Sequence, residues 1–599
     1  MSIRSANPRS TLASALASAG VLIAAIFALP HTAPADPPAA KPNLVLITTD
    51  DQTLEEMWAL PQTEALLGAA SAGVSFDRAY ISYPLCCPSR ATILSGRYMH
   101  NNGVRGNNGA DGGWQAFRRS SESVALPTWL QDAGYYTVNI GKYMNGYAGG
   151  PPPIPPGWDE WYGKVSEYDP GVYGARIYYN YRVREDPPED GGLPCPTAKP
   201  PSPGAPFTCT YGQTVRDYQT DVLRDKALEA IHRLGGDENP KRPFFINLAF
   251  NAPHSPYIPA PRHIGRYADA EIRKPRGSNE KRISDKPRFL RRLPRLGRGQ
   301  LRRIQERRQA RAEMLIAVDE AIYTVVAALA AENELSNTYL IFTSDNGYFN
   351  GEHRIRQGKY LPHEPSSHVP LMIRGPGIPT GATSEELVSN VDIAETIRTI
   401  AGASAKLPQD GRSLLPFAAD PSLRSTRPLL LEGDTGPGID DEGVEGPDLD
   451  DERRLRKHYE KIRRQKKKLR RQCKRLKRVS PKRAQVCFKR GVRNLEQEPT
   501  DPNFDLHAPA YRSLRTHRYQ LILYSTGEIE LYDMRRDPEQ LRSLHRTRRY
   551  KKVRKWMLAK LDRFRGCVGA SCSEQIGPEP PKLKRKKGKR ARRSIDHRR

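Results

Sequence analysis

The sequence predicts an α/β protein with a large, mostly parallel central sheet, and three observations support this. Three continuous apolar runs, over 43–49, 244–250 and 338–343, have the length and composition of strands buried on both faces. Helical patterns lie between such runs, as over 310–332. Each run leads into polar residues. Alternating strands and helices are typical of an α/β sandwich, whose sites form beyond the carboxyl ends of its strands.

The polar residues after these runs are the first candidate site residues. The run 43–49 leads to Asp50 and Asp51, and the run 338–343 leads through Ser344 to Asp345 and Asn346. The run 244–250 leads to His254. We therefore expect these side chains to share one site. Acidic residues after strands often only cap the next helix, which is the competing interpretation of either acidic pair.

The chain is long enough for several domains, and changes in composition predict five parts. Residues 511–533 alternate as a hairpin does around a Gly turn, whereas the stretch before them and the end of the chain are highly charged. The expected parts are a signal peptide over 1–35, a catalytic domain over 36–430 with a basic insertion at 261–310, a charged insertion over 431–500, a C-terminal α+β subdomain over 501–575 and a disordered basic tail over 576–599.

The start of the chain has the pattern of a secretory signal. Arg4 and Arg9 precede an apolar stretch over 12–29, and Ala33-Pro34-Ala35 has the form of a cleavage site. An uncleaved anchor is the alternative; no membrane span is expected after signal removal. We expect a secreted, periplasmic or extracellular protein. The chain has no Asn-x-Ser/Thr sequon and is rich in Ala, Arg and Pro, which favours a bacterial source.

Export permits disulfides, and six of the eight cysteines fall into close pairs. Each pair could close a small loop, although spacing does not fix the connectivity. The pairs are Cys195 with Cys209, Cys473 with Cys487, and Cys567 with Cys572. Cys86 and Cys87 are left over.

The net charge of +29 is concentrated in three segments. Residues 261–310, 451–490 and 580–599 carry net charges of +12, +17 and +10, so the rest of the chain is acidic. We expect the segments 451–490 and 580–599 to bind anionic polysaccharide; solvated, merely solubilising insertions are the alternative. Nucleic acid is not expected as a partner.

The most informative motif is Cys86-Cys87-Pro88-Ser89-Arg90, followed by Leu-Ser-Gly-Arg at 94–97. A pair of buried thiols or of metal ligands is the competing interpretation. The motif resembles the site at which sulfatases convert the first cysteine to formylglycine, which implies an alkaline-phosphatase-like sandwich for the predicted fold. The aldehyde adds water, one hydroxyl attacks sulfur, and the other re-forms the carbonyl and expels sulfate. The resemblance makes Cys86 the modified residue and implies a formylglycine-generating enzyme as its partner during maturation.

The resemblance also implies a divalent-metal site. Its ligands would be the oxygens of Asp50, Asp51, Asp345 and Asn346, together with the modified Cys86. Hard oxygen ligands suit one Ca²⁺ per chain, with Mg²⁺ as the alternative. The ion would hold the diol and a sulfate oxygen and lower the pKa of the attacking hydroxyl.

Further stretches match the family in the same order. Lys142 in Gly-Lys-Tyr and Lys359 in Gly-Lys-Tyr would bind sulfate. His254 in Ala-Pro-His-Ser-Pro would protonate the leaving alcohol or bind a sulfate oxygen, and Arg90 would hydrogen-bond the formylglycine. Met144 stands where many sulfatases have His, so we expect Asn145 to contact substrate in its place.

These matches predict an exported, metal-dependent sulfuric ester hydrolase that acts on a sulfated sugar or polysaccharide, with aryl sulfates as artificial substrates. The motifs resemble most the N-acetylglucosamine-6-sulfatase and heparan endosulfatase branch. Two alternatives remain open. One is a phosphonate monoester or phosphodiester hydrolase with the same site, and the other is a non-catalytic polyanion-binding protein.

Overall fold

Ten strands form the central sheet, in the order β11-β2-β10-β9-β1-β8-β4-β5-β6-β7. The computed structural model describes residues 41–70, 72–148, 152–166, 177–189, 193, 195–198, 202, 204–236, 242–268, 270–434 and 508–580. The five strands β9, β1, β8, β4 and β5 run parallel to one another. The strands outside them pair antiparallel, apart from β11 with β2. The predicted α/β fold class is confirmed.

The three predicted strands lie side by side at the centre of this sheet. They are β1 (Asn43–Thr49), β8 (Phe244–Ala249) and β9 (Thr338–Ser344). The remaining strands of the sheet are β2 (Val74–Phe76), β4 (Tyr136–Gly141), β5 (Glu160–Lys164), β6 (Arg182–Asp186), β7 (Phe207–Thr210), β10 (Leu371–Arg374) and β11 (Ala382–Ser384). A separate pair joins β3 (Ala79–Tyr80) to β12 (Val388–Ser389).

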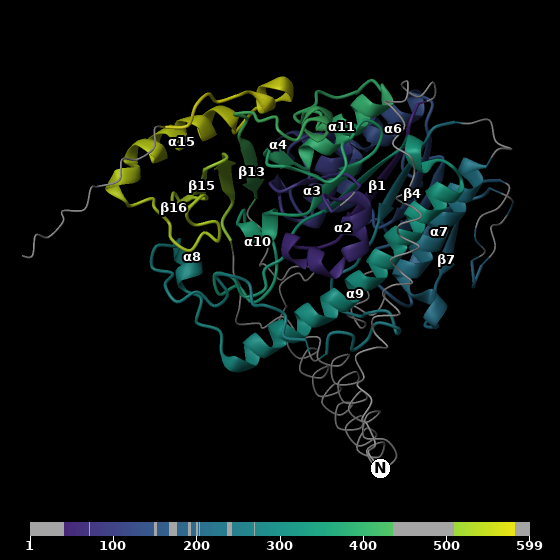
Figure 1. The fold of residues 1–599 in the computed structure, drawn as a ribbon, viewed down its shortest axis with the longest axis horizontal. Helices are drawn as coiled ribbons and strands as arrows, with labels where there is room; N and C mark the ends of the chain where they lie inside the picture. Colours follow the sequence, from purple (N-terminus) through teal and green to yellow (C-terminus); the bar gives the residue numbers. More distant parts are fainter. Residues whose placement is uncertain are drawn as a thin grey trace, which may run out of the picture. The chain divides into compact units, whose positions relative to one another are not determined.

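Helices cover both faces of the sheet, which explains why its central strands are apolar throughout (Figure 1). Val45 and Ile47 of β1 pack on one face with α2 (Pro61–Leu67), α7 (Gln219–Gly235) and α9 (Arg298–Ala331). Leu44 and Leu46 pack on the other face. The helices there are α3 (Cys86–Ser95), α5 (Gly113–Ser120), α6 (Leu126–Asp132) and α11 (Val391–Ala401). Successive residues of a strand point to opposite faces, so both layers need apolar partners.

Helix α9 begins twelve positions before the helix predicted over 310–332 and ends at Ala331. The end of the basic segment 261–310 is thus the first part of a core helix, because Arg, Gln and Leu are good helix formers even without an apolar face. By length and composition α9 would also suffice to cross a membrane. Its apolar part is packed against α7 and α2 inside the protein.

A second sheet is formed by the C-terminal part of the chain. Its four antiparallel strands are β13 (Leu429–Gly433), β14 (Tyr511–Arg515), β15 (Tyr519–Tyr524) and β16 (Ile529–Asp533), and α15 (Lys551–Phe564) packs against them. The predicted hairpin is therefore confirmed. Gly433 pairs with Tyr511, so residues 434–510 join two neighbouring strands. The insertion predicted over 431–500 starts later than expected, because residues 431–433 belong to β13.

Two of the three cysteine pairs considered above form disulfides, Cys195–Cys209 and Cys567–Cys572. Cys473 and Cys487 lie outside the described residues, as do the predicted signal peptide, the segment 451–490 and residues 581–599.

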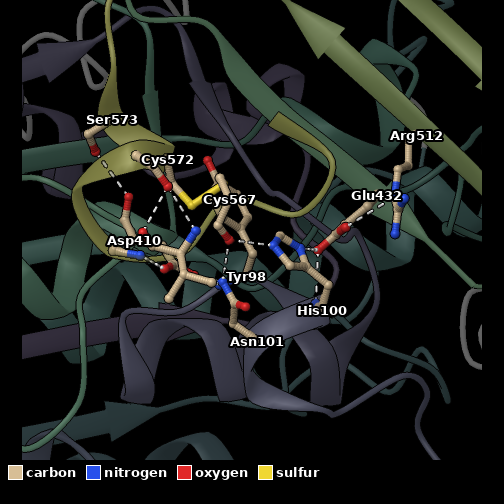
Figure 2. Close-up of a disulfide and its surroundings, with 12 residues drawn as sticks. Tyr98, His100, Asn101, Asp410, Glu432, Arg512, Cys567, Cys572 and Ser573 are labelled. Atoms are coloured by element: carbon tan, nitrogen blue, oxygen red, sulfur yellow. Dashed lines mark hydrogen bonds and ion pairs between the residues drawn. A yellow bond between two sulfur atoms is a disulfide. The ribbon is translucent and has the colours of Figure 1, made fainter. Parts of the chain in front are cut away.

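The loop closed by Cys567 and Cys572 fastens the C-terminal part to the part that contains the central sheet (Figure 2). His100, on the short helix α4 (Met99–Asn102), places Nε2 2.9 Å from the carbonyl oxygen of Cys567 and Nδ1 2.7 Å from Glu432. Asp410 accepts hydrogen bonds from the backbone of Tyr98 and of Gly569 in the same loop.

Candidate active site

The predicted site residues meet at the carboxyl edge of four adjacent parallel strands. Asp50 and Asp51 directly follow β1, and Lys142 directly follows β4. Asp345 begins the loop after β9, and His254 lies in the loop after β8. All five side chains are buried. With Lys359, which lies 2.6 Å from Asp51, the structure brings together predicted site residues that are up to 308 positions apart in the sequence.

Cys86 is the first residue of α3, a helix whose ten residues are all buried. Its Sγ lies 2.8 Å from the Nζ of Lys359 and 3.5 Å from a carboxylate oxygen of Asp50. Burial raises the pKa of the Cys86 thiol well above its usual value, against the opposing effect of Lys142 and Lys359. A protonated thiol is a poor nucleophile, so this cysteine is unsuited to attack in its unmodified form.

Each carboxylate around Cys86 is paired with a buried cation. Asp50 contacts the ammonium group of Lys142, and Asp51 lies 2.6 Å from that of Lys359. Asp345 accepts a hydrogen bond of 2.8 Å from Nε of Arg90, which stands one turn after Cys86 on α3. Paired burial of this kind avoids the large cost of isolated buried charges.

The pKa values of the two facing carboxyls move in opposite directions. Burial acts to raise the pKa of Asp50, but the charge of Lys142 and the other cations outweighs it, so the pKa is lowered. The pKa of Asp345 is raised by burial and then by the neighbouring charge of Asp50. Asp50 therefore stays ionised against Lys142, whose own pKa Asp50 raises despite burial.

The oxygen atoms of this cluster fit a divalent cation. Carboxylate oxygens of Asp50, Asp51 and Asp345 lie within 4.8 Å of one another. The Nδ2 of Asn346 donates to Asp51 over 2.6 Å, whereas its buried Oδ1 has no hydrogen-bond partner. A set of close carboxylates with a spare amide oxygen suits Ca²⁺ or Mg²⁺. Asp51 also has a φ of 70°, a conformation that is uncommon for non-glycine residues and recurs at functional sites.

His254 faces the same cluster. Its Nε2 lies 3.9 Å from Asp51, and its Nδ1 lies 2.5 Å from the carbonyl oxygen of Ser255. Because a carbonyl only accepts, Nδ1 carries the proton in this contact. The hydroxyl of Tyr178 lies within hydrogen-bond distance of the carbonyls of Asn251 and His254 and holds the loop.

Asn145 lies beside the motif through its backbone. Its amide donates to Sγ of Cys87 over 3.1 Å, and its carbonyl accepts from the amide of Trp114. Met144, which occupies the position of the family's His, is buried among apolar residues. Cys87 is a buried free thiol. Its backbone amide donates to the side chain of Asn107, and its Sγ accepts from the amide of Asn145.

Sequence reasoning missed a buried ion pair behind the site. Arg311, on α9, forms a two-pronged pair with Glu56, with distances of 2.6 and 2.7 Å. The same guanidinium donates to the carbonyl of Asp51 over 2.6 Å and to that of Pro253 over 3.3 Å. It thus joins the loop of the acidic pair to the loop of His254. The sequence does contain a sign of this pair. Arg311 lies on the same apolar face of α9 as Leu315 and Val318, and an arginine on a buried face needs a carboxylate or another acceptor as its partner.

A second missed residue is Lys164, the last residue of β5. Burial and, after it, the positive charge of Lys142 lower its pKa to about 8, against the opposing effect of Asp50. This places an additional titrating amine within electrostatic range of the site.

A family model described as Sulfatase matches residues 42–403, which contain every predicted site residue. N-acetylglucosamine-6-sulfatase of Homo sapiens is 34% identical over 415 residues, covering 66% of this chain and 68% of the human one. An extracellular sulfatase SULF-1 homolog of Drosophila melanogaster is 32% identical over 381 residues, 63% of this chain. The chain spans 31% of the length of that fly protein and 49% of a Sulf-1 homolog of Caenorhabditis elegans.

Solved structures share the fold. A protein crystallised with its substrate D-glucosamine-2-N,6-O-disulfate superposes with a TM-score of 0.59 at 21% identity, covering 87% of this chain and 97% of that one. Phosphonate monoester hydrolase of Agrobacterium radiobacter has a TM-score of 0.56 at 19% identity, with coverages of 87% and 95%. The fold is the alkaline-phosphatase-like sandwich. With the family match over more than half of its length, the chain belongs to the sulfatase family.

Proposed function

We propose that this protein is an exported sulfuric ester hydrolase whose nucleophile derives from Cys86. The observation that carries the proposal is the position of Cys86, buried between the ammonium group of Lys359 and the carboxylate of Asp50. Three further cationic or basic groups, Arg90, Lys142 and His254, lie around Cys86 and Asp50. Such a cluster suits an anionic sulfate ester held beside the group that must attack its sulfur atom.

Modification of Cys86 to formylglycine explains why a buried, protonated thiol occupies the centre of the site. The aldehyde binds water to give two hydroxyls on one carbon. One hydroxyl attacks sulfur, and the bond from sulfur to the alcohol oxygen breaks. Loss of the proton from the second hydroxyl re-forms the aldehyde and releases sulfate.

The surrounding side chains divide the remaining work. Lys142 and Lys359 hold the negative oxygens of the sulfate group, and the Arg90 Nη2, which is buried without a hydrogen-bond partner, donates to the hydroxylated residue 86. His254 carries its proton on Nδ1, so it must gain one on Nε2 before it can protonate the leaving alcohol.

Asp50, Asp51, Asp345, Asn346 and the modified residue 86 would hold one divalent cation, Ca²⁺ by preference. When bound, this ion supplies positive charge against the sulfate oxygens and favours ionisation of the attacking hydroxyl. The donor set described above fits that role because all its side-chain donors, including a hydroxyl of the modified residue 86, would be oxygens.

A sulfated sugar is the proposed substrate class, and the motifs and the similar proteins support it. The human relative is named for N-acetylglucosamine 6-sulfate, and one structural neighbour was solved with a disulfated glucosamine. Secretion is proposed from the pattern over 1–35 and from the extracellular relatives. The segments 451–490 and 580–599 remain the proposed polyanion-binding insertions.

Paired turnover measurements test this function. The wild-type protein should hydrolyse 4-nitrophenyl sulfate with a higher kcat/KM than a matched phenylphosphonate or phosphodiester. It should then release sulfate from glucosamine 6-sulfate. Faster turnover of the phosphonate or phosphodiester would make the protein the alternative hydrolase. No turnover of any ester by protein carrying the aldehyde would contradict the proposal.

A further inference from the structure

Residues 273–303 form a strongly basic surface, called here the arginine surface. The segment holds 13 Lys and Arg against two Asp and Glu, a net charge of +11. Twelve of these basic side chains are exposed, the exception being Lys286. Within this fully described segment neither acidic residue is exposed, because Glu280 is buried and Asp285 is half-buried. The positive charge therefore faces solvent almost without compensation from the segment itself.

The arginine surface has a defined backbone. The side chain of Asn279 exchanges two hydrogen bonds with the backbone of Leu296, at 2.9 and 2.8 Å, and so closes the segment. The short helix α8 (Arg288–Arg291) lies between them, and Leu290 and Leu293 are buried. These leucines belong to an apolar cluster that also contains Tyr360 and Leu361. The inward side chains thus anchor the segment beside Lys359 while the cations point outward.

Hydrogen bonds also join the arginine surface to the loop that ends at Lys359. The guanidinium of Arg354 donates to the carbonyls of Glu280, Lys281 and Leu293, at 2.9, 3.1 and 2.9 Å. The amide of Asn279 donates to Gly351 over 2.7 Å. The loop closes where Phe349 donates to Gly358, the residue before Lys359. The arginine surface therefore keeps a fixed position relative to one of the proposed sulfate-binding lysines.

From this placement we infer that the arginine surface binds the anionic chain of a sulfated polysaccharide while one of its sulfate groups lies in the site. This inference rests on the proposed function and adds the polymeric class of substrate to it. Ten of the 13 cations are arginines, whose planar donors suit oxyanions. A chain with several sulfates can meet the arginine surface and Lys359 together, which isolated sugars cannot.

The position of the exposed cations separates this interpretation from general solubility. Arg276 pairs with Glu539 over 2.9 Å and Arg291 lies 3.8 Å from Glu528, so part of the charge has a structural partner. Arg292, Arg295 and Arg298 are exposed and lie between α8 and the first turn of α9. Cations that only increase solubility need not gather beside the proposed active site. Cations that bind duplex DNA need not lie there either, so this position favours a substrate.

The test compares two variants of the full chain. Arg292→Gln/Arg295→Gln/Arg298→Gln removes three exposed charges from the arginine surface. Lys551→Gln/Lys552→Gln/Lys555→Gln removes three exposed charges from α15 and is the matched control. Heparin is added as an inhibitor of 4-nitrophenyl sulfate hydrolysis at low and moderate salt, and duplex DNA of equal charge is tested in parallel.

We expect heparin to inhibit the wild type and the control equally, and its half-inhibitory concentration to rise about tenfold in the arginine variant at low salt. The salt dependence of inhibition should flatten, since fewer counterions are exchanged. The inference would be overturned if heparin inhibited the arginine variant as strongly as the wild type, or if the control variant lost heparin inhibition to the same extent. It would also be overturned if the arginine variant lost inhibition by DNA only. Hydrolysis of the aryl sulfate without polymer reports on the proposed function separately, and it should be the same in all three proteins.

Discussion

The ammonium nitrogen of Lys359 lies 2.8 Å from the sulfur of Cys86, although 273 positions separate the two residues. The same nitrogen lies 2.6 Å from Asp51. Lys359 therefore links the residue that we expect to be modified with a carboxylate of the proposed cation site. Any group attached to residue 86 during turnover lies within its reach.

Removing the lysine charge should abolish most turnover. Lys359→Met keeps the length of the side chain but loses the interaction with the sulfate group, so kcat/KM for an aryl sulfate should fall by two or more orders of magnitude, roughly. Lys142→Met should lower kcat/KM to a similar extent. His254→Ala should lower it by a similar factor, because the variant lacks the proposed general acid. Circular dichroism should show all three folded. Near wild-type turnover in any of them would remove that residue from the mechanism.

Chelation should inactivate and destabilise the protein. A cation that binds only the native state adds about 2.7 kcal/mol when its concentration is 100 times its Kd. We therefore expect EDTA to lower Tm, and added Ca²⁺ to restore both Tm and activity. Asp345→Asn should be less sensitive to EDTA because it has lost a ligand. A Tm that is the same with and without EDTA in the wild type would count against the cation site.

The pair of Arg311 and Glu56 should position the site as well as stabilise the fold. Arg311→Met leaves Glu56 buried and unpaired, which should cost about 3–5 kcal/mol of unfolding free energy. The double variant Glu56→Gln/Arg311→Met removes that unpaired charge and should recover part of the stability.

Activity should not return with stability in this double variant. The loops of Asp51 and His254 still lack their shared donor, so cation affinity and kcat/KM should stay about 10- to 100-fold below wild type. Urea denaturation and a Ca²⁺ titration monitored by Tm measure the two effects. Full recovery of Ca²⁺ affinity together with stability would reduce the role of Arg311 to folding.

His100 should make attachment of the C-terminal loop depend on pH. Burial lowers its pKa, but the hydrogen bond to Glu432 outweighs this, and the net pKa is raised. Both ring nitrogens face oxygens that only accept, the Glu432 carboxylate and the Cys567 carbonyl, so protonated His100 is the bound form. Since the folded pKa exceeds the unfolded value near 6.5, this stabilisation is complete below about pH 6.5 and is lost as pH rises through the folded pKa.

The matching measurement is the Tm difference between wild type and His100→Gln across pH. The difference should be largest near pH 6 and shrink towards pH 9. A difference that grows with pH would have the wrong sign for this ion pair.

The sequence predicts the features that leave a local pattern better than those that depend on contacts between residues far apart in the chain. β1, β8 and β9 were predictable because strands covered on both faces leave unbroken apolar runs, and polar residues directly after them mark the carboxyl edge. β11 and β12, with three and two residues, are too short to leave a pattern. The start of α9 was missed because its first turns carry basic rather than apolar residues.

The catalytic motif was predictable because Cys86 and Arg90 are close in sequence, whereas the ion pairs that hold the site are not. Glu56 and Arg311 are 255 positions apart, and no local pattern identifies such partners. The expected substitution of Asn145 for the family's His also depended on side-chain placement. The contacts found for Asn145 involve its backbone, and its side-chain role stays a prediction.

The most direct test is the mass of the tryptic peptide 79–90 from active protein. We expect residue 86 to carry an aldehyde and Cys87 to remain a thiol, because Cys86 alone lies against Lys359 and Asp50. Cys86→Ala should then lose activity while Cys87→Ala keeps most of it at equal folded yield. An unmodified thiol at residue 86 in protein that hydrolyses sulfate esters, or an aldehyde at residue 87, would contradict the account.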